Sequence, residues 1–224
     1  MTSAIIVAAG TGKRFGRLKQ FALLCGKPLV FHTLEKFERS RSVAEIVLVV
    51  PARSVSKMRE ETQKFGYKKV KRIVAGGQRR MDSVYSGLLA AEGDIVIVHD
   101  GVRPLVTPSI IDRGVRSCKK HGACIYAIRA TDTVKLAQNG SVKNTLRREE
   151  VYLTQTPQVF ERPVLLEAYI SAYEKGIEAP DDSYLVERIG IPVKILRGFR
   201  ENIKVTSPSD LYLVEALMAG GENE

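Results

Sequence analysis

Short apolar runs alternate along the chain with longer segments in which apolar residues recur at helical spacing. The first run covers residues 4–9, and further runs lie at 46–50, 70–74, 95–98, 123–128 and 193–196. An uninterrupted apolar run such as residues 4–9 is typical of a strand buried on both faces of a parallel sheet. The other segments predict helices at 28–37, 55–65, 82–91, 108–121 and 163–175, a short helix after Asp181 and a last helix that begins at Pro208.

This alternation predicts an α/β fold with a Rossmann-like, mainly parallel sheet and helices on both faces. We expect one domain over residues 1–224. Between residues 131 and 155 the pattern changes to short polar segments around Asn139-Gly140, the dipeptide most suited to a tight hairpin turn. We therefore expect a protruding β-arm there. The arm has too few apolar side chains for a core of its own, so a second subunit could supply the surface that stabilises it.

The chain carries a formal net charge of +10, from 35 Lys and Arg against 25 Asp and Glu. Such a charge suits nucleic acid, an anionic membrane surface or small phosphorylated substrates. The sequence has no helix-turn-helix pattern, zinc finger or aromatic RNA-binding signature, and no apolar stretch long enough for a membrane span. We expect small phosphates as partners, and neither nucleic acid nor membrane. A non-catalytic nucleotide- or nucleic-acid-binding protein stays open as an alternative of a different class.

The three cysteines, Cys25, Cys118 and Cys124, lack metal-ligand spacing and stand among apolar or helix-like neighbours. We expect neither a zinc site nor a disulfide framework. Residues 1–10 lack the basic start and the cleavage site of a signal peptide. Together these features predict a cytoplasmic protein.

A glycine-rich segment at 8–16 follows the first predicted strand, where open parallel sheets place their ligand crevices. Gly10 and Gly12 would let backbone N–H groups approach phosphate oxygens, with the positive charges of Arg14 and Lys19 beside them. The segment is not a Walker A loop, because no Gly-Lys-Ser/Thr sequence closes it. The alternative is a tight turn with two solvated basic side chains.

Asp100 lies just after the predicted strand at 95–98, again at the ligand edge of the sheet. A carboxylate there can hold Mg²⁺, which commonly bridges the phosphates of a nucleoside triphosphate. We predict Asp100 as the metal ligand. The neighbouring His99 is more typical of a packed or hydrogen-bonded structural residue.

Several sequence blocks, spread in order over nearly the whole chain, resemble a known enzyme family. They are residues 8–14 with Lys19-Gln20-Phe21 and 26–29, and residues 76–88, 98–104, 131–135, 154–160, 181–187 and 202–211. The first block is similar to the opening signature of the sugar-nucleotide pyrophosphorylase and cytidylyltransferase superfamily. Lys-Gln-Phe narrows the resemblance to the 2-C-methyl-D-erythritol 4-phosphate cytidylyltransferases and their ribitol phosphate relatives.

The resemblance implies a nucleotidyltransferase that transfers the cytidylyl group of CTP to 2-C-methyl-D-erythritol 4-phosphate. The reaction would release pyrophosphate and belong to isoprenoid precursor biosynthesis in the methylerythritol phosphate pathway. A ribitol 5-phosphate cytidylyltransferase is the alternative within the same class.

The resemblance also implies a role for each matched residue. The catalytic residues would be Arg14, Lys19 and Lys204. Nucleotide binding, with the cytosine pocket in block 76–88, would fall to Ala8, Ala9, Gly10, Gly12, Gly77, Arg80 and Ser83. Acceptor binding would fall to Asp100, Arg103, Thr133, Arg148 and Thr156, with Mg²⁺ on Asp100. For Asp82 and Ser83 the alternative is that they only cap the helix that follows them.

By the same likeness the arm is exchanged across a homodimer, so that Thr133, Arg148 and Thr156 bind the acceptor phosphate in the partner's active site. For Asp132 and Lys135, simple strand pairing is an equal alternative. The chain departs from the family pattern at Leu18, where a proline often precedes the lysine of a longer loop. It departs again at Pro180, which replaces a threonine, and the following Asp181 has an alternative role as a helix cap.

Overall fold

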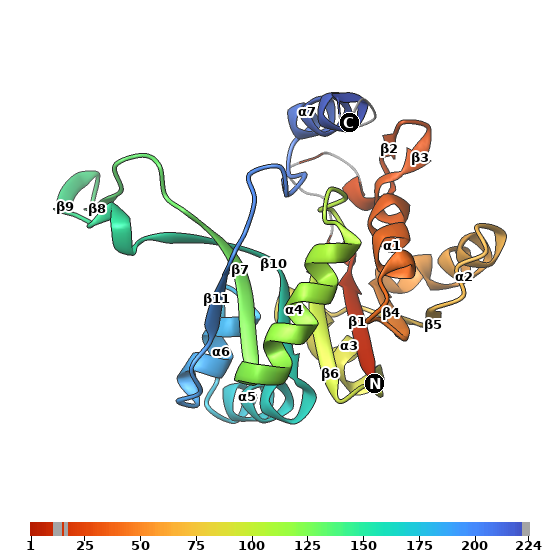
Figure 1. The fold of residues 1–224 in the computed structure, drawn as a ribbon, viewed down its shortest axis with the longest axis horizontal. Helices are drawn as coiled ribbons and strands as arrows, with labels where there is room; N and C mark the ends of the chain where they lie inside the picture. Colours follow the sequence, from red (N-terminus) through yellow and green to blue (C-terminus); the bar gives the residue numbers. More distant parts are fainter. Residues whose placement is uncertain (11–14, 16–17, 221–224) are drawn as a thin grey trace.

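The computed structural model describes residues 1–10, 15 and 18–220, and its centre is a seven-stranded sheet with strand order β11-β7-β10-β6-β1-β4-β5 (Figure 1). Its strands in chain order are β1 (Thr2–Val7), β4 (Glu45–Val50), β5 (Val70–Ala75), β6 (Ile95–Asp100), β7 (Ala123–Arg129), β10 (Tyr152–Glu161) and β11 (Lys194–Arg197). Every residue of β4 and β6 is buried, as expected for strands covered on both faces. The prediction of a mainly parallel α/β sheet is confirmed.

Seven α-helices lie among the described residues, and six of them, α1 to α6, cover the two faces of this sheet. They are α1 (Leu29–Arg39), α2 (Val55–Lys64), α3 (Arg80–Ala90), α4 (Pro108–His121), α5 (Arg162–Glu174), α6 (Asp182–Arg188) and α7 (Pro208–Gly220). One hydrophobic core joins the sheet to α1, α2 and α4, and a second joins it to α3, α5 and α6. Helices therefore pack on both faces, as the alternating pattern predicts.

Strand β10 is a feature that the hydrophobic pattern does not predict. It runs antiparallel between β6 and β7, while the other described strands of the sheet pair in parallel. Its sequence breaks the apolar pattern with Pro157 and with the polar residues Gln155, Thr156 and Gln158. Those three polar side chains are nevertheless buried, because the strand lies between two neighbours. Tertiary pairing has overridden the local pattern here.

The β-arm is present where the polar segments predict it. Strands β8 (Lys135–Gln138) and β9 (Ser141–Thr145) pair antiparallel, and all their residues are exposed. The turn between them is formed by Asn139 and Gly140, with φ angles of 52° and 77°, which these two residue types tolerate best. Figure 1 shows the arm projecting well away from the body, beyond the ends of β7 and β10.

A third, smaller hydrophobic cluster lies at the end of the sheet where β1 and β6 finish. It joins the segment around the short helix η2 (Lys19–Phe21) and the hairpin of β2 (Leu23–Leu24) and β3 (Lys27–Pro28) to α7 and the residues before it. Its buried members are Phe15, Ala22, Leu24, Leu29, Val102, Val205, Leu211 and Val214. This cluster holds residues from both halves of the chain beside the same edge of the sheet.

None of the helices formed by the described residues combines the length and the apolar composition that crossing a bilayer requires. The three cysteines are free thiols, and Cys118 and Cys124 are buried.

At Gly87, helix α3 lies close against the sheet. A methyl group there would overlap Cγ2 of Ile5 and lie 3.0 Å from Cγ2 of Val49. Both side chains belong to the buried core and have no room to move, so we expect Gly87→Ala to lower the free energy of unfolding by about 1–3 kcal/mol. Urea denaturation measures this loss. Gly220→Ala is the matched control, because no atom of the described chain beyond its own helix lies within 4 Å of the added methyl group. A loss equal to that of the control would contradict the packing account.

Candidate active site

Two adjoining hollows lie around Asp100, the last residue of β6, whose register partner is Val7 at the end of β1. The first, which we call the Gly10 hollow, has a volume of about 340 Å³. It is lined by Val7, Ala8, Ala9, Gly10, Lys19, Gln20, Gly77, Gln78, Arg79, Arg80, Ser83, Asp100, Val102 and Lys204. It lies at the carboxyl ends of parallel strands, where open α/β sheets bind their ligands.

The carboxylate of Asp100 is surrounded by three cationic side chains. Its Oδ2 lies 2.8 Å from Nζ of Lys204 and 3.4 Å from Nε of Arg103, and its Oδ1 lies 3.5 Å from Nε of Arg80. Asp100 is only 6% exposed. Burial raises the pKa of its carboxyl, but the charges of Lys204, Arg80 and Arg103 outweigh this effect and hold the pKa well below its ordinary value. The carboxylate is therefore ionised at neutral pH.

The segment before α7 brings both predicted catalytic lysines of the described chain to this place. Lys204 itself contacts Asp100, while the backbone carbonyl of the next residue, Val205, accepts a hydrogen bond from Nζ of Lys19 at 3.0 Å. The N–H of Val205 in turn donates to the carbonyl of Val102 at 2.9 Å. The C-terminal segment is thus tied to the turn after β6 and to the N-terminal segment together.

The second hollow, which we call the Thr156 hollow, has a volume of about 360 Å³. It is lined by Arg80, Asp100, Arg103, Thr154, Gln155, Thr156, Gln158, Pro180, Asp181 and Lys204. Two hydrogen bonds of Thr156 join β10 to its neighbours in this hollow. Oγ1 of Thr156 accepts from the Asp100 N–H at 3.1 Å, and the Thr156 carbonyl accepts from Asn202 Nδ2 at 2.7 Å. The two hollows share Arg80, Asp100 and Lys204, so a ligand in each would meet across these three side chains.

The glycine pair before α3 lets the chain approach the end of β1. A methyl group on Gly76 would overlap Cβ of Ala9 and lie 2.7 Å from Oγ of Ser83. The N–H of Gly77 donates to Oγ of Ser83 at 3.1 Å, and that hydroxyl donates to the Arg79 carbonyl. Asp82 accepts from the Arg79 N–H at 3.0 Å and so acts as a helix cap, whereas Ser83 also lines the Gly10 hollow.

The model of the 2-C-methyl-D-erythritol 4-phosphate cytidylyltransferase family matches residues 2–220. The chain is 43% identical to the enzyme of that name from Alkaliphilus oremlandii, over 97% of this chain and 94% of the relative. It is 42% identical to that from Geobacter metallireducens, over 96% of both. The crystal structure of 4-diphosphocytidyl-2C-methyl-D-erythritol synthase from Anaerococcus prevotii superimposes with a TM-score of 0.87 at 29% identity, over 98% of this chain and 96% of that one.

The chain belongs to the 2-C-methyl-D-erythritol 4-phosphate cytidylyltransferase family. The resemblance stated from the sequence blocks is confirmed, and the chain is a nucleotidyltransferase.

Most residues predicted from the cytidylyltransferase blocks come together around Asp100. The Gly10 hollow contains Ala8, Ala9, Gly10, Lys19, Gly77, Arg80, Ser83, Asp100 and Lys204, and the Thr156 hollow adds Arg103 and Thr156. Thr133 and Arg148 are exposed on the arm and line neither hollow of their own chain. Gly12 and Arg14 lie outside the described residues. Asp181 caps α6 by accepting from the Tyr184 N–H at 3.0 Å, as its alternative role predicts, and it also lines the Thr156 hollow.

Three buried polar residues that the family blocks did not single out support this cytidylyltransferase site. Gln20 donates to the Gly10 carbonyl at 3.0 Å, and Asn202 accepts from Arg103 through its carbonyl at 2.6 Å. Asp182 accepts from Arg80 at 2.9 Å. All three residues lie inside matched blocks or beside named residues, but only the folded structure shows that they are buried and which groups they contact.

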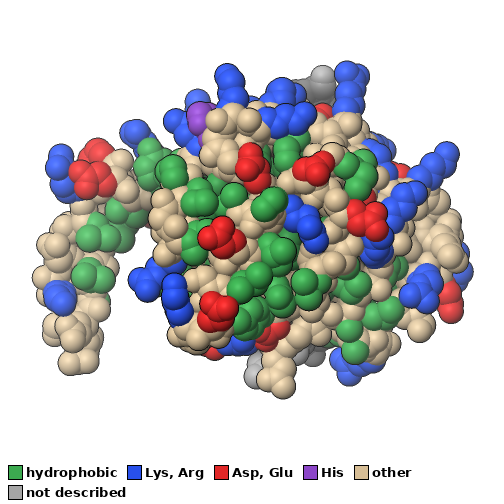
Figure 2. Space-filling model, turned by 90° about the horizontal axis from the view of Figure 1, so that it is seen from below, with side chains coloured by type: hydrophobic (Ala, Val, Ile, Leu, Met, Phe, Trp, Pro, Cys, Tyr) green, Lys and Arg blue, Asp and Glu red, His purple; other side chains and the backbone are tan. Residues whose placement is uncertain are grey.

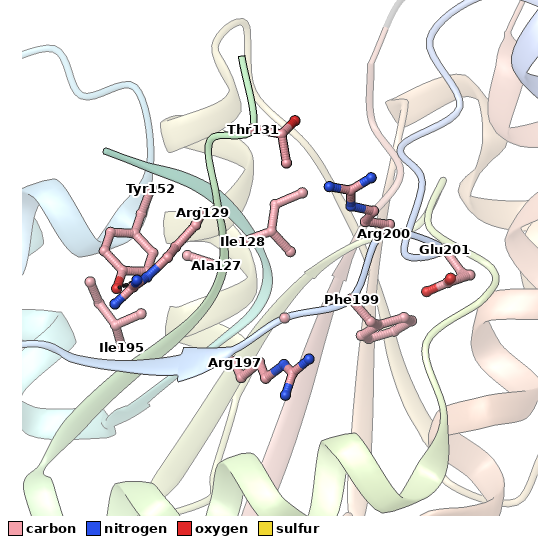
Figure 3. Close-up of a pocket in the computed structure, with 11 residues that line it drawn as sticks. Ala127, Ile128, Arg129, Thr131, Tyr152, Ile195, Arg197, Phe199, Arg200 and Glu201 are labelled. Atoms are coloured by element: carbon pink, nitrogen blue, oxygen red, sulfur yellow. Dashed lines mark hydrogen bonds between the residues drawn. The ribbon is translucent and has the colours of Figure 1, made fainter. Parts of the chain in front are cut away.

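A larger hollow, of about 770 Å³, lies elsewhere, at the base of the arm. Figure 3 shows Arg129 beside Tyr152 on one side of it and Arg200 on the other. Arg129 donates to the Tyr152 hydroxyl at 2.9 Å. None of the described residues predicted for nucleotide or metal binding lines this hollow, whereas they do line the smaller hollows around Asp100.

His99 has a structural role beside the site. Its Nε2 lies 3.2 Å from the carbonyl of Arg103, its ring packs 5.0 Å from that of Phe37, and it lines neither hollow. Burial lowers the pKa of His99 to about 3. The neutral imidazole therefore donates from Nε2 to the carbonyl and helps to fix the turn between Asp100 and Arg103.

The lowered pKa of His99 makes stability depend on pH. Below its ordinary pKa of about 6.5 the unfolded chain binds a proton that the folded chain excludes, so acid favours unfolding. We expect the free energy of unfolding to fall as pH drops from about 6.5 toward 3, with at most about 1.4 kcal/mol per pH unit from this group. Buried His32, whose pKa is also lowered by burial, adds an effect of the same sign.

Urea denaturation at pH 5 and pH 7 tests this dependence. Gln at position 99 cannot titrate but can still donate to the Arg103 carbonyl, so His99→Gln should reduce the difference between the two pH values. An unchanged difference in the variant would contradict the assignment.

Proposed function

We propose that the chain transfers the cytidylyl group of CTP to 2-C-methyl-D-erythritol 4-phosphate, with CTP in the Gly10 hollow and the acceptor in the Thr156 hollow. The observation that carries this arrangement is that the two hollows meet at Arg80, Asp100 and Lys204. A phosphate ligand in each hollow would place the acceptor phosphate and the α-phosphate of CTP on either side of these three charged side chains. The family's own name supports this pair of substrates.

The transfer needs positioned charge and no covalent enzyme intermediate. An oxygen of the acceptor phosphate attacks the α-phosphorus of CTP in line, a new P–O bond forms, and the bond to the β-phosphate breaks to release pyrophosphate. The acceptor phosphate is already ionised near neutral pH, since its second pKa is about 6, so no general base is required. Lys204 and Arg80 stabilise the charge that develops at the α-phosphate, and Lys19 and Arg14 bind the departing phosphates.

The donor set around Asp100 fits Mg²⁺ that arrives with the nucleotide. Among the described residues no three His, Cys, Asp or Glu side chains form a ready metal cage. Mg²⁺ is commonly held by one or two carboxylates together with substrate phosphates, and Asp100 is an ionised carboxylate between the two hollows. We propose that Asp100 holds Mg²⁺. The ion would neutralise phosphate charge, while Lys204 would move its contact from Asp100 to the phosphates.

Cytosine is proposed to lie beside Gly77 and Ser83. In the structure these groups bond to each other, so a bound base would share or replace that hydrogen bond. Since cytosine and uracil differ at one exocyclic position, fixed donors and acceptors at this place would give the preference for CTP.

The arm is proposed to complete the acceptor site of a second subunit. It exposes apolar side chains that its own chain leaves uncovered, namely Leu136, Val142, Leu146 and Leu153. Figure 2 shows the arm on the left, standing clear of the body with hydrophobic side chains on its visible surface. A homodimer would cover these side chains and would bring Thr133 and Arg148 to the partner's acceptor phosphate.

The three free cysteines are consistent with a proposed cytoplasmic location.

A pyrophosphate-release assay tests the substrates. The protein is incubated with Mg²⁺, each nucleoside triphosphate in turn and either 2-C-methyl-D-erythritol 4-phosphate or ribitol 5-phosphate. We expect turnover with CTP and the methylerythritol phosphate. Turnover only with ribitol 5-phosphate, or none with CTP, would overturn the proposal.

Lys204→Ala should lower kcat about 10²- to 10³-fold, because it removes a cation aimed at the developing charge. Lys119→Ala is the control, since Lys119 is an exposed lysine on α4 that lines neither hollow. Steady-state kinetics measure both variants. A Lys204→Ala enzyme with the rate of the control would remove this residue from the mechanism.

Mixing two inactive variants tests the shared site. In a heterodimer of Lys204→Ala and Arg148→Ala chains, one site has both defects and the other has an intact body and an intact arm. Co-expression of the two chains should therefore restore up to about a quarter of wild-type activity when chains pair at random. Heterodimers isolated by two affinity tags that show no recovery would contradict a site completed by the partner's arm.

A further inference from the structure

Arg80 is held between two carboxylates, one inside the two hollows and one behind them. Its Nε faces Oδ1 of Asp100 at 3.5 Å, and its Nη2 donates to Oδ2 of Asp182 at 2.9 Å. Within the described part of the chain, Nη1 of Arg80 takes part in no hydrogen bond. The guanidinium is thus fixed on two sides and keeps one donor group for a ligand.

The rear carboxylate, Asp182, is completely buried and belongs to α6. Its other oxygen, Oδ1, accepts from the hydroxyl of Tyr169 on α5 at 2.6 Å. Neither Asp182 nor Tyr169 lines the Gly10 hollow or the Thr156 hollow. Tyr169, Asp182 and Arg80 therefore form a chain of hydrogen bonds that leads from the core between helices to the charged cluster.

The charges in this chain are well defined. Burial raises the pKa of the Tyr169 hydroxyl, and the neighbouring Asp182 raises it further, so the phenol stays protonated and acts as a donor. Burial lowers the pKa of Arg80, but Asp182 and Asp100 more than offset this effect and keep the guanidinium charged. A buried carboxylate is costly unless each oxygen is paired, and here both oxygens have a partner.

We infer that Asp182, held by Tyr169, is a positioning residue that aims Arg80 at the phosphates shared by the two hollows. The inference rests on the proposed function. The contact with Asp182 prevents Arg80 from forming a closer ion pair with Asp100. Such a pair would neutralise the carboxylate that is proposed to hold Mg²⁺. Contact with both Asp100 and Asp182 requires the planar guanidinium of arginine, because its N–H donors point in different directions. Tyr169 fixes the rotamer of Asp182 and so acts one step further away.

Two conservative substitutions probe this chain in the full-length enzyme. Asp182→Asn removes the negative charge and leaves one acceptor oxygen for two donors, Arg80 and the Tyr169 hydroxyl. We expect kcat/KM for CTP to fall about 10- to 100-fold, as for loss of a hydrogen bond to a charged group. Tyr169→Phe removes only the hydroxyl and should cost about 3- to 10-fold. Tyr85→Phe is the matched control, because its ring stacks 5.6 Å from that of Tyr169 and its hydroxyl lies outside this chain of hydrogen bonds. Its activity should match that of wild type.

A double-mutant cycle separates positioning from a general loss of structure. If Asp182 acts through Arg80, then Asp182→Asn or Tyr169→Phe should have no further effect once Arg80→Ala is present. If the two residues only support the fold, they should lower activity by the same factor in both backgrounds. That second outcome, or wild-type kinetics in Asp182→Asn, would overturn the inference. An inactive wild-type chain would instead indicate failure of the proposed function.

Discussion

The arrangement of the whole site depends on one buried carboxylate. Asp100 ends the central strand β6 and is nearly removed from water, so its charge needs partners. The partners come from three places: Arg80 at the start of α3, Arg103 in the turn after β6, and Lys204 before α7. Because each of these cations is also attracted to phosphate, the ion pairs that stabilise the Asp100 carboxylate are the ones that a triphosphate and its metal ion would replace. The folded protein thus holds several positive charges close together before any substrate binds.

The rest of the molecule keeps those charges in place. The cluster around Val102 and Val205 joins the N-terminal segment to α7, and the Val102–Val205 hydrogen bond sets the position of Lys204 beside the sheet. On one face of the sheet, the core of α3, α5 and α6 contains Tyr169, whose hydroxyl is linked to Arg80 through Asp182. Rigid supports of this kind allow a long, flexible cation to contribute to catalysis without a large loss of side-chain entropy during the reaction. The arm has no such support in its own chain, which agrees with a role across a subunit interface.

Local sequence signals predicted much of this structure, and long-range contacts account for what they missed. Helix α4 runs over 108–121 as predicted, because Thr107 caps its start and Gly122, at a φ of 74°, ends it. Strand β10 was missed, since buried Gln155, Thr156 and Gln158 interrupt its apolar pattern and only pairing with β6 and β7 explains their burial. The family blocks identified Asp100 and Lys204 as site residues, but no local pattern shows that Lys204 lies 2.8 Å from Asp100. In the sequence, Asp182 is one of two adjacent acidic residues. Only the folded structure shows that it is buried and accepts a hydrogen bond from Arg80.

The ionisation of Asp100 is the most direct measure of this account. Carbon-13 NMR of the side-chain carboxyl, titrated between pH 6.5 and the acid limit of the folded state, gives its pKa in wild type and in Lys204→Met. Asp100 in wild type should remain ionised below its ordinary pKa of about 3.9, and its midpoint should rise when the Lys204 charge is removed. An ordinary midpoint in wild type, unchanged by the substitution, would show that the cations do not converge on this carboxylate.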